Sequence, residues 1–324
     1  MRRTIRPGSI LVTACALALS LLVLRPSPAR AQPCGTRTSH PKTYAHVIWI
    51  WMENHGYSDI IGSPNAPYIN SLASSCGLAT NYHNLTHLSL PNYIGAVTGL
   101  DLSALQPFLL DCNPNLAGSC HSDAPSIFDQ ATSWKAYQES MPSNCAPTGF
   151  SPYGVRHNPP TYLSSLAATC PTFDVAYTEL QGDLDNNTLP AFSFVTPNNI
   201  NNMHDGSDPG AIQNGDAWLA AELPKILNSA AYQSGNTVVF VTFDEGEFGT
   251  GFSVGEDCAR NTSDASCRVP TIVISPSTRV GSTSPTLFSH YSLLKTTEQL
   301  LGIRTHLGRA KETRTRSMRP AFRF

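Results

Sequence analysis

Five short apolar runs, separated by segments with helical periodicity, constrain the fold of this 324-residue chain more than any other feature. The runs predict strands at residues 46–52, 173–178, 191–196, 237–243 and 270–274. Helices are expected between them, at residues 66–75, 91–98, 126–133, 161–168, 215–229 and 291–302. Short apolar strands that alternate with helices are typical of an α/β fold, in which helices cover both faces of a mostly parallel sheet.

Acidic side chains follow two of these predicted strands directly. Glu53 and Asn54 come after residues 46–52, and Asp244 and Glu245 come after residues 237–243. Open α/β sheets bind ligands at the carboxyl ends of their strands. Adjacent carboxylates at the end of a buried strand are unfavourable unless a cation neutralises them, as a divalent ion held by oxygen ligands does. Each pair alone also fits a solvated loop, but the two pairs together favour a metal site.

A hydroxyl near the start of a predicted helix supplies a candidate nucleophile. Proline is favoured at the first helical position, so Pro91 places Ser89 at the beginning of that helix. Free N–H groups and the positive end of the helix dipole attract anions at such a place. We therefore expect Ser89, rather than the nearby Thr86, to attack phosphorus in a phosphoryl-transfer reaction. The chain has no Gly-x4-Gly-Lys loop, which excludes a P-loop enzyme.

Three segments that contain histidine add candidates for phosphate contact or proton transfer. His204 and Asp205 follow a stretch of turn-forming residues, and by themselves they also fit an exposed turn. Arg156 and His157 place a cation beside an imidazole, a pair suited to phosphate oxygens. His290 precedes the last predicted helix, where it would cap the helix, ligate a metal or contact an anion. The other candidates have no stronger case than surface polar residues: His83, His87 and His121.

Residues 1–31 form a predicted secretory signal peptide. Arg2, Arg3 and Arg6 precede an apolar stretch, and Ala-Arg-Ala at residues 29–31 fits a small-x-small cleavage site. The apolar stretch has about 15 residues, fewer than the roughly 20 that span a membrane, which favours cleavage over retention as an anchor. We expect the mature chain to be secreted or to lie in the cell envelope, without a stable membrane span.

Eight cysteines follow the predicted signal peptide. An even number in an exported chain predicts four disulfides. Short spacing favours the pairs Cys112–Cys120 and Cys258–Cys267 and leaves the other pairing open. A zinc site is disfavoured because the chain has no Cys-x-x-Cys pair. The loop-rich stretches at residues 102–120 and 246–267 are expected to be surface insertions that frame the active site.

Charge is distributed unevenly along the chain. Residues 32–303 contain nine basic and 22 acidic residues, a net charge of −13 with neutral histidines, which disfavours nucleic acid as a partner. Residues 304–324 contain seven basic residues and one acidic residue. This composition predicts a flexible, solvated tail, and contact with an anionic membrane or wall polymer is the alternative.

Seven short motifs occur in one order along the chain, and together they resemble the phosphoesterase family of bacterial non-specific phospholipases C and secreted acid phosphatases. The closest similarity is to secreted acid phosphatases that act on phosphatidylinositol 3-phosphate. The resemblance runs from about residue 45 to residue 303, nearly all of the mature chain, and implies an alkaline-phosphatase-like sandwich with a phosphoesterase domain at residues 32–303. The motifs lie at residues 51–55, 89–93, 156–159, 202–206, 216–219, 243–246 and 289–291.

The resemblance also implies a set of site residues. Five would surround a divalent metal, with the serine as the attacking hydroxyl: Glu53, Asn54, Ser89, Asp244 and Glu245. The others would line the phosphate pocket or aid proton transfer: His157, His204, Asp205 and His290. Oxygen ligands suit Mg, Ca or Mn, whereas histidine also allows Zn.

The expected activity is metal-assisted hydrolysis of phosphate monoesters, including phospholipid head groups such as phosphoinositides, through a phosphoserine. A phospholipase C that cleaves phospholipid diesters is one alternative. A non-catalytic surface binding protein on the same fold is the other. The sequence leaves the oligomeric state open.

Overall fold

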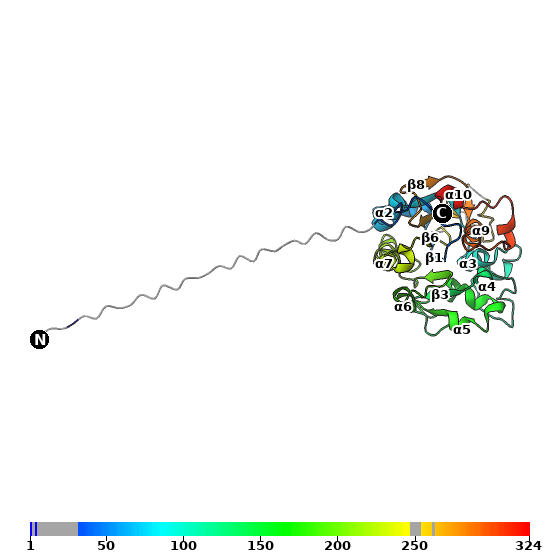
Figure 1. Cartoon of the computed structure of the whole chain (residues 1–324). Helices are drawn as coiled ribbons and strands as arrows, with labels where there is room; N and C mark the ends of the chain where they lie inside the picture. Colours follow the sequence, from blue (N-terminus) through cyan, green and yellow to red (C-terminus); the bar gives the residue numbers. More distant parts are fainter. Residues whose placement is uncertain (2–3, 5–31, 247–253, 261–262) are drawn as a thin grey trace. The chain divides into compact units, whose positions relative to one another are not determined.

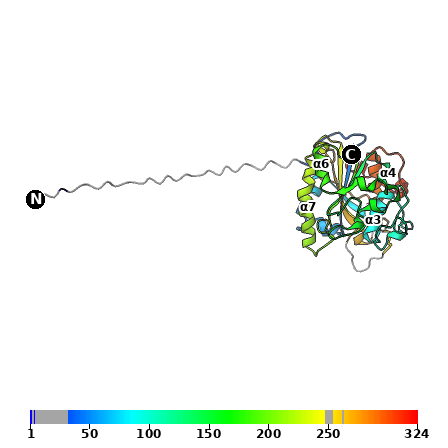
Figure 2. The ribbon, with the colours of Figure 1, turned by 90° about the horizontal axis from the view of Figure 1, so that it is seen from below.

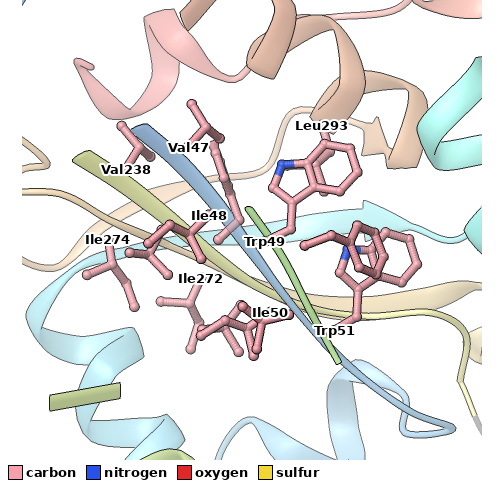
Figure 3. Close-up of a cluster of buried hydrophobic side chains, with 14 of the residues drawn as sticks. Val47, Ile48, Trp49, Ile50, Trp51, Val238, Ile272, Ile274 and Leu293 are labelled. Carbon is pink, nitrogen blue, oxygen red and sulfur yellow. The ribbon is translucent and has the colours of Figure 1, made fainter. Parts of the chain in front are cut away.

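In the computed structural model, strand β1 (His46–Met52) lies in the middle of the sheet, between β5 and β6. All its residues except the first are buried, because helices cover both faces of the sheet there. Figure 3 shows the side chains of Trp49 and Trp51 on one side of this strand and those of Ile48 and Ile50 on the other. One strand therefore supplies apolar side chains to both layers of the core.

The structure describes residues 1, 4, 32–246, 254–260 and 263–324. Most of the predicted signal peptide and part of the insertion at residues 246–267 lie outside the described residues. Contacts divide the chain into residues 1–31 and residues 32–324, and the second unit contains all the helices and strands given below. Within the described part, no helix is both long and apolar enough to cross a bilayer.

The described strands form one sheet in the order β4-β3-β5-β1-β6-β7-β2-β8, and β9 pairs with β2. Strands β4, β3, β5, β1 and β6 are parallel, whereas β7 is antiparallel to both of its neighbours. This confirms the predicted α/β class with a mostly parallel sheet. The other strands are β2 (Gly77–His83), β3 (Trp134–Gln138), β4 (Asp174–Ala176), β5 (Phe192–Thr196), β6 (Thr237–Phe243), β7 (Arg268–Ile274), β8 (Ser282–Ser284) and β9 (Phe288–Ser289).

Helices lie on both sides of the sheet (Figures 1 and 2). On one side α7 packs on α2 and α6, and on the other α3 packs on α4 and α9. The α-helices are α1 (Tyr57–Ile60), α2 (Pro67–Ser75), α3 (Ser89–Thr98), α4 (Ile127–Gln130), α5 (Cys170–Phe173), α6 (Glu179–Asp185), α7 (Gly210–Leu227), α8 (Ala230–Gln233), α9 (His290–Leu300) and α10 (Arg319–Phe322). The short 3₁₀ helices span Gln106–Phe108, Val155–His157, Pro159–Tyr162, Ser164–Leu166, Ala265–Cys267 and Gly308–Lys311.

The predicted helix at residues 161–168 is wrong, and the structure has two 3₁₀ turns there. Leu163 between them is extended and forms a parallel bridge with Ser122, which takes its backbone out of the helical region. The helix predicted at residues 126–133 is reduced to the single turn α4, because β3 begins at Trp134. Strands β2 and β3 were not predicted, since neither contains a continuous apolar run.

Four disulfides join all eight cysteines after residue 31. Both predicted pairs, Cys112–Cys120 and Cys258–Cys267, are confirmed. The two longer links are Cys34–Cys76 and Cys145–Cys170. Four disulfides are consistent with a protein that lies outside the cytoplasm.

The prediction of a flexible tail at residues 304–324 is wrong. Arg309 donates its N–H to Gly99 O (2.7 Å) at the end of α3, and Met318 donates its N–H to the Thr296 hydroxyl (2.8 Å) in α9. The tail therefore packs on the same two helices that border the candidate site. Its buried apolar side chains are Leu307, Ala310, Met318, Phe322 and Phe324.

One buried carboxylate in α9 holds the beginning of this tail. Glu298 accepts the N–H of Leu307 (2.7 Å) and lies 2.7 Å from Nδ1 of His306. Burial raises the pKa of the Glu298 carboxyl to about 8, against the lowering effects of the Leu307 N–H and the charge of Lys295. In the window from about pH 4 to pH 8 the folded chain keeps a proton that the unfolded chain has lost, so the free energy of unfolding falls as pH rises.

Glu298→Gln should remove this contribution, because the amide cannot titrate. We compare the difference in melting temperature, wild type minus variant, at the two pH values. We expect this difference to be at least about 2 °C lower at pH 8 than at pH 5. Thermal unfolding of both proteins at the two pH values measures this. The His306 and Lys295 side chains are present in both proteins, so the comparison isolates Glu298. An equal difference at both pH values would contradict the raised pKa.

Candidate active site

Two parallel strands bring the acidic pairs together at the carboxyl edge of the sheet. Met52 at the end of β1 pairs with Phe243 at the end of β6, so the following residues leave the sheet side by side. Asp244 donates its backbone N–H to Met52 O (3.0 Å), and Asn54 donates its backbone N–H to Asp244 Oδ1 (3.1 Å). The predicted convergence of these two strand ends therefore occurs.

The Ser89 hydroxyl faces two of these acids. Ser89 is the first residue of α3 and is 3 % exposed. Its Oγ lies 3.2 Å from Glu53 Oε2 and 3.4 Å from Glu245 Oε1. The sequence separates the three residues by up to 192 positions, and the fold places them in hydrogen-bond contact.

One oxygen of each carboxylate is held by a protein donor, and the other is left for the site. Tyr93 OH donates to Glu53 Oε1, and His87 Nδ1 contacts Glu245 Oε2. The second oxygen of each carboxylate, Glu53 Oε2 or Glu245 Oε1, faces Ser89. Asp244 Oδ2 is buried and has no hydrogen-bond partner among the described residues. Three carboxylate oxygens are thus presented to one small volume.

This arrangement is electrostatically unfavourable without a cation. Burial raises the pKa of Glu53 and of Glu245 well above that of an ordinary glutamate, and the neighbouring Asp244 charge raises both further. Burial also raises the pKa of Asp244. Unpaired buried carboxylates of this kind fit a hard divalent cation that takes oxygen ligands. The chemistry of the donor set therefore fits the metal expected from the sequence.

Two histidines and an arginine lie next to Glu53. His157 Nε2 is 3.3 Å from Glu53 Oε2, and the ligand atoms of Glu53, His157 and His204 all lie within 4.8 Å of one another. Arg156 donates from Nη2 to His204 Nε2 (2.7 Å), which leaves the proton of the imidazole on Nδ1, 2.8 Å from Asp205 Oδ1. Burial, followed by the charges of Arg156 and His204, holds the pKa of His157 well below its ordinary value.

His290 is placed differently from the other histidines. It is fully buried under the site, with Nδ1 accepting from Tyr82 OH (3.0 Å) and Nε2 donating to Asp244 O (2.8 Å). Burial lowers the pKa of His290 to about 4. Since both ring nitrogens are engaged, the geometry suits a role in fixing Asp244 better than contact with substrate.

Sequence reasoning missed three residues of the site. His87, which the sequence ranked no higher than a surface polar residue as a site candidate, is fully buried and contacts Glu245. Tyr93 lies four residues after Ser89 in α3, on the same helix face, and holds Glu53. That spacing was a usable signal. Asp111, from the predicted insertion at residues 102–120, gave no signal because no local pattern connects it to the site.

Asp111 also corrects the predicted anion site at the start of α3. The helix begins at Ser89, so Pro91 is its third residue and not its first. Asp111 Oδ1 accepts the N–H of Leu90 (2.9 Å), so this N–H is not free for a phosphate. The other oxygen, Oδ2, lies 3.7 Å from Arg156 Nε. Asp111 therefore links the helix of the candidate nucleophile to the guanidinium beside His204.

Asp111→Ala should loosen this guanidinium. We expect KM for p-nitrophenyl phosphate to rise about tenfold, since a contact worth about 1.4 kcal/mol is lost, with a smaller change in kcat. Asp111→Asn keeps an acceptor for the Leu90 N–H but not the charge, so its KM should lie between those of the wild type and Asp111→Ala. Steady-state kinetics of both variants measures this, with the exposed Asp101→Ala from the same region of the chain as control. An unchanged KM in both variants would contradict the linking role.

A competing serine motif lies in the second insertion. Residues 251–255 read Gly-Phe-Ser-Val-Gly, the Gly-x-Ser-x-Gly pattern of α/β-hydrolases. In those enzymes the pattern joins a strand directly to a helix, whereas β6 ends at Phe243, well before it. Ser253 itself lies outside the described residues. Ser89 remains the better candidate.

Comparison with known proteins gives a family and several relatives. The model of the Phosphoesterase family matches residues 63–304. A phosphatidylinositol-3-phosphatase from Mycobacterium tuberculosis is 29% identical over 272 residues, which cover 83% of this chain and 81% of that protein. An acid phosphatase from Aspergillus fumigatus is 28% identical over 241 residues, or 70% of this chain and 50% of that longer protein.

Solved structures show the same fold. An alkaline phosphatase superfamily protein from Vibrio parahaemolyticus has a TM-score of 0.54 at 13% identity, covering 88% of this chain and 71% of its own. The lipoteichoic acid synthase LtaP from Listeria monocytogenes has a TM-score of 0.56 at 11% identity, covering 84% and 76%. These similarities confirm the predicted alkaline-phosphatase-like fold.

Proposed function

Because this chain belongs to the Phosphoesterase family and is a hydrolase acting on phosphoric esters, we propose that it cleaves phosphate monoesters with Ser89 as the nucleophile. The observation that carries the proposal is the position of the Ser89 hydroxyl between Glu53 and Glu245, beside the unpartnered Asp244 Oδ2. A serine buried among acids has no evident structural purpose, whereas a metal-assisted phosphatase needs this grouping.

A divalent cation is the proposed cofactor. It would be held by Glu53, Asn54, Ser89, Asp244 and Glu245, and when bound it would lower the pKa of the serine hydroxyl and polarise a phosphoryl oxygen. The Asn54 backbone N–H orients Asp244, and Asn54 lines a neighbouring cavity together with His204. Tyr93 and His87 hold the carboxylates in place from behind.

The chain's own groups suggest a two-step reaction. Ser89 Oγ forms a bond to phosphorus as the ester P–O bond breaks, and the serine proton passes to a facing carboxylate, Glu53 Oε2 or Glu245 Oε1. His204, which Asp205 holds at Nδ1, would supply the proton of the leaving alcohol from Nε2 in its protonated form, once Arg156 turns its guanidinium to the phosphate. Water then attacks phosphorus and breaks the phosphoserine bond: one water proton returns to His204, the carboxylate returns its proton to Ser89 Oγ, and inorganic phosphate is released.

The side chains around Ser89 are the proposed contacts for the substrate. Arg156 and His157 would contact the non-bridging phosphate oxygens, and Asp205 would orient His204. A mainly polar cavity of about 280 Å³ opens beside Asn54 and His204. Its size and lining suit the alcohol portion of the ester, which includes a phosphoinositide head group among the proposed substrates.

A substrate panel tests the proposal. Purified protein supplied with Mg, Ca, Mn or Zn is assayed on p-nitrophenyl phosphate, phosphatidylinositol 3-phosphate and phosphatidylcholine. The proposal expects release of inorganic phosphate from the monoesters. Diacylglycerol from phosphatidylcholine without monoester cleavage would instead establish the phospholipase C alternative. No hydrolysis with any metal would favour a non-catalytic binding protein.

A further inference from the structure

A second cavity, of about 680 Å³, lies among three segments that are distant in the sequence. It is lined by side chains before β1, after β7 and at the end of the tail. The polar ones are Arg37, Thr38, His40, Ser277, Arg279 and Arg323. Three guanidinium groups and an imidazole therefore share one cavity in a protein whose residues 32–303 carry a net charge of −13.

The segments that form this cavity contain no acidic side chain. Residues 35–40, 277–280 and 323, which line it, hold three arginines and no Asp or Glu, whereas the rest of the chain after residue 31 holds 13 basic and 23 acidic residues. Among the described residues, no carboxylate lies within 4.0 Å of the guanidinium groups of Arg37, Arg279 or Arg323. The positive charge of the cavity is therefore not neutralised by ion pairs there.

The cavity has a defined wall. Arg37 donates from Nη2 to Gln233 O (2.9 Å), and its backbone N–H donates to Pro276 O (2.9 Å). The disulfide Cys34–Cys76 attaches this segment to the end of α2. On the other side, the Ser277 hydroxyl lies 2.9 Å from Tyr44 OH. The arginine is thus presented from a fixed backbone.

The cavity is remote from the acidic centre. Ile274 at the end of β7 pairs with Val239 near the beginning of β6, so Ser277 and Arg279 follow at the amino edge of the parallel strands. Asp244 lies at the carboxyl edge of the same strand β6, which at about 3.3 Å per residue is roughly 20 Å long. A ligand in the cavity would leave the Ser89 centre open.

We propose that this cavity is a binding site for a ligand with two or more clustered phosphate-type oxyanions. Guanidinium groups bind phosphate oxygens in pairs of charge-assisted hydrogen bonds, and Thr38 and Ser277 add hydroxyl donors. Such charges occur on soluble polyphosphorylated molecules and at a surface of anionic phospholipid head groups. The proposal does not depend on the catalytic role of Ser89.

Two double variants with the same loss of charge test it. Arg279→Ala with Arg323→Ala removes two exposed guanidinium groups from the cavity, and Arg304→Ala with Arg316→Ala removes two exposed ones from the tail outside it. Binding is measured by calorimetry with sucrose octasulfate, a compact polyanion without a phosphate ester. It is also measured by co-sedimentation with phosphatidylglycerol–phosphatidylcholine vesicles, at low and high salt.

We expect the cavity variant to bind at least about tenfold more weakly than the wild type, and the tail variant to bind within about twofold of it. Loss with sucrose octasulfate alone identifies a soluble ligand, and loss with vesicles identifies a head-group surface. Hydrolysis of p-nitrophenyl phosphate should be unchanged in both variants, which also shows that they are folded. Equal weakening in the two variants, or no binding of either probe by the wild type, would overturn the proposal.

Discussion

Ser89→Ala is expected to lower kcat for p-nitrophenyl phosphate by at least about a thousand-fold. The loss follows from the geometry, because no other described hydroxyl lies between Glu53 Oε2 and Glu245 Oε1. The melting temperature should change by only a few degrees, since a hydroxyl is replaced by hydrogen in a site that keeps its shape. Steady-state kinetics and thermal unfolding of the purified variant measure the two effects.

Thr86→Ala is the control for this experiment. Thr86 is a buried hydroxyl on the loop before α3, and its Oγ1 donates to His87 O (3.3 Å) without facing the carboxylates. It should keep at least about a tenth of the wild-type kcat. Acid quenching of wild-type turnover, followed by peptide mapping, should find phosphate on Ser89. If Ser89→Ala keeps more than a tenth of wild-type activity, the serine is not the nucleophile.

Asp244→Asn is expected to abolish both activity and stabilisation by a divalent cation. A ligand that binds only the folded state at a hundredfold excess over its Kd adds about 2.7 kcal/mol to the free energy of unfolding. For a chain of this size this is a rise of roughly 4–5 °C in melting temperature. The wild type stripped with chelator should show the rise when Mn²⁺ is added, and should regain activity with it. The variant should show neither effect.

Without metal, the wild type should no longer be more stable than Asp244→Asn. Asp244→Asn removes one of three buried like charges, so the metal-free variant should melt at or above the metal-free wild type. Asp185→Asn, the same chemical change at an exposed position in α6, should respond to Mn²⁺ like the wild type. Full activity of the chelated wild type, or an equal rise in the Asp244 variant, would contradict a metal site at this place.

The parts of the site that the sequence predicts are those carried by strand ends. Buried strands appear as apolar runs, and parallel neighbours end at one edge, so the amino-acid order alone predicts that Glu53 and Asp244 lie close together. The contacts that complete the site depend on long-range packing. His87 meets Glu245 and Asp111 meets Leu90 only because the connecting loops fold back over the sheet, and no local periodicity encodes this.

The prediction for the tail at residues 304–324 failed for a different reason. Its seven basic residues suggested a solvated segment, but composition averages over positions with different surroundings. Met318, Phe322 and Phe324 are buried, while the neighbouring Arg316 and Arg323 are exposed. A few apolar side chains at suitable spacing are enough to fold a basic segment onto an apolar core, because burial of each contributes about 1.5–3 kcal/mol.

In the proposed site, carboxylates that follow β1 and β6 gather around one cation that faces the Ser89 oxygen. An anomalous difference map from crystals grown with Mn²⁺ tests it most directly, since the signal locates the metal without reference to activity. We expect one strong peak between Glu53, Asp244 and Glu245, within about 2.5 Å of their free oxygens and of Ser89 Oγ. A map with no peak among these side chains, or with the metal bound elsewhere, would contradict it.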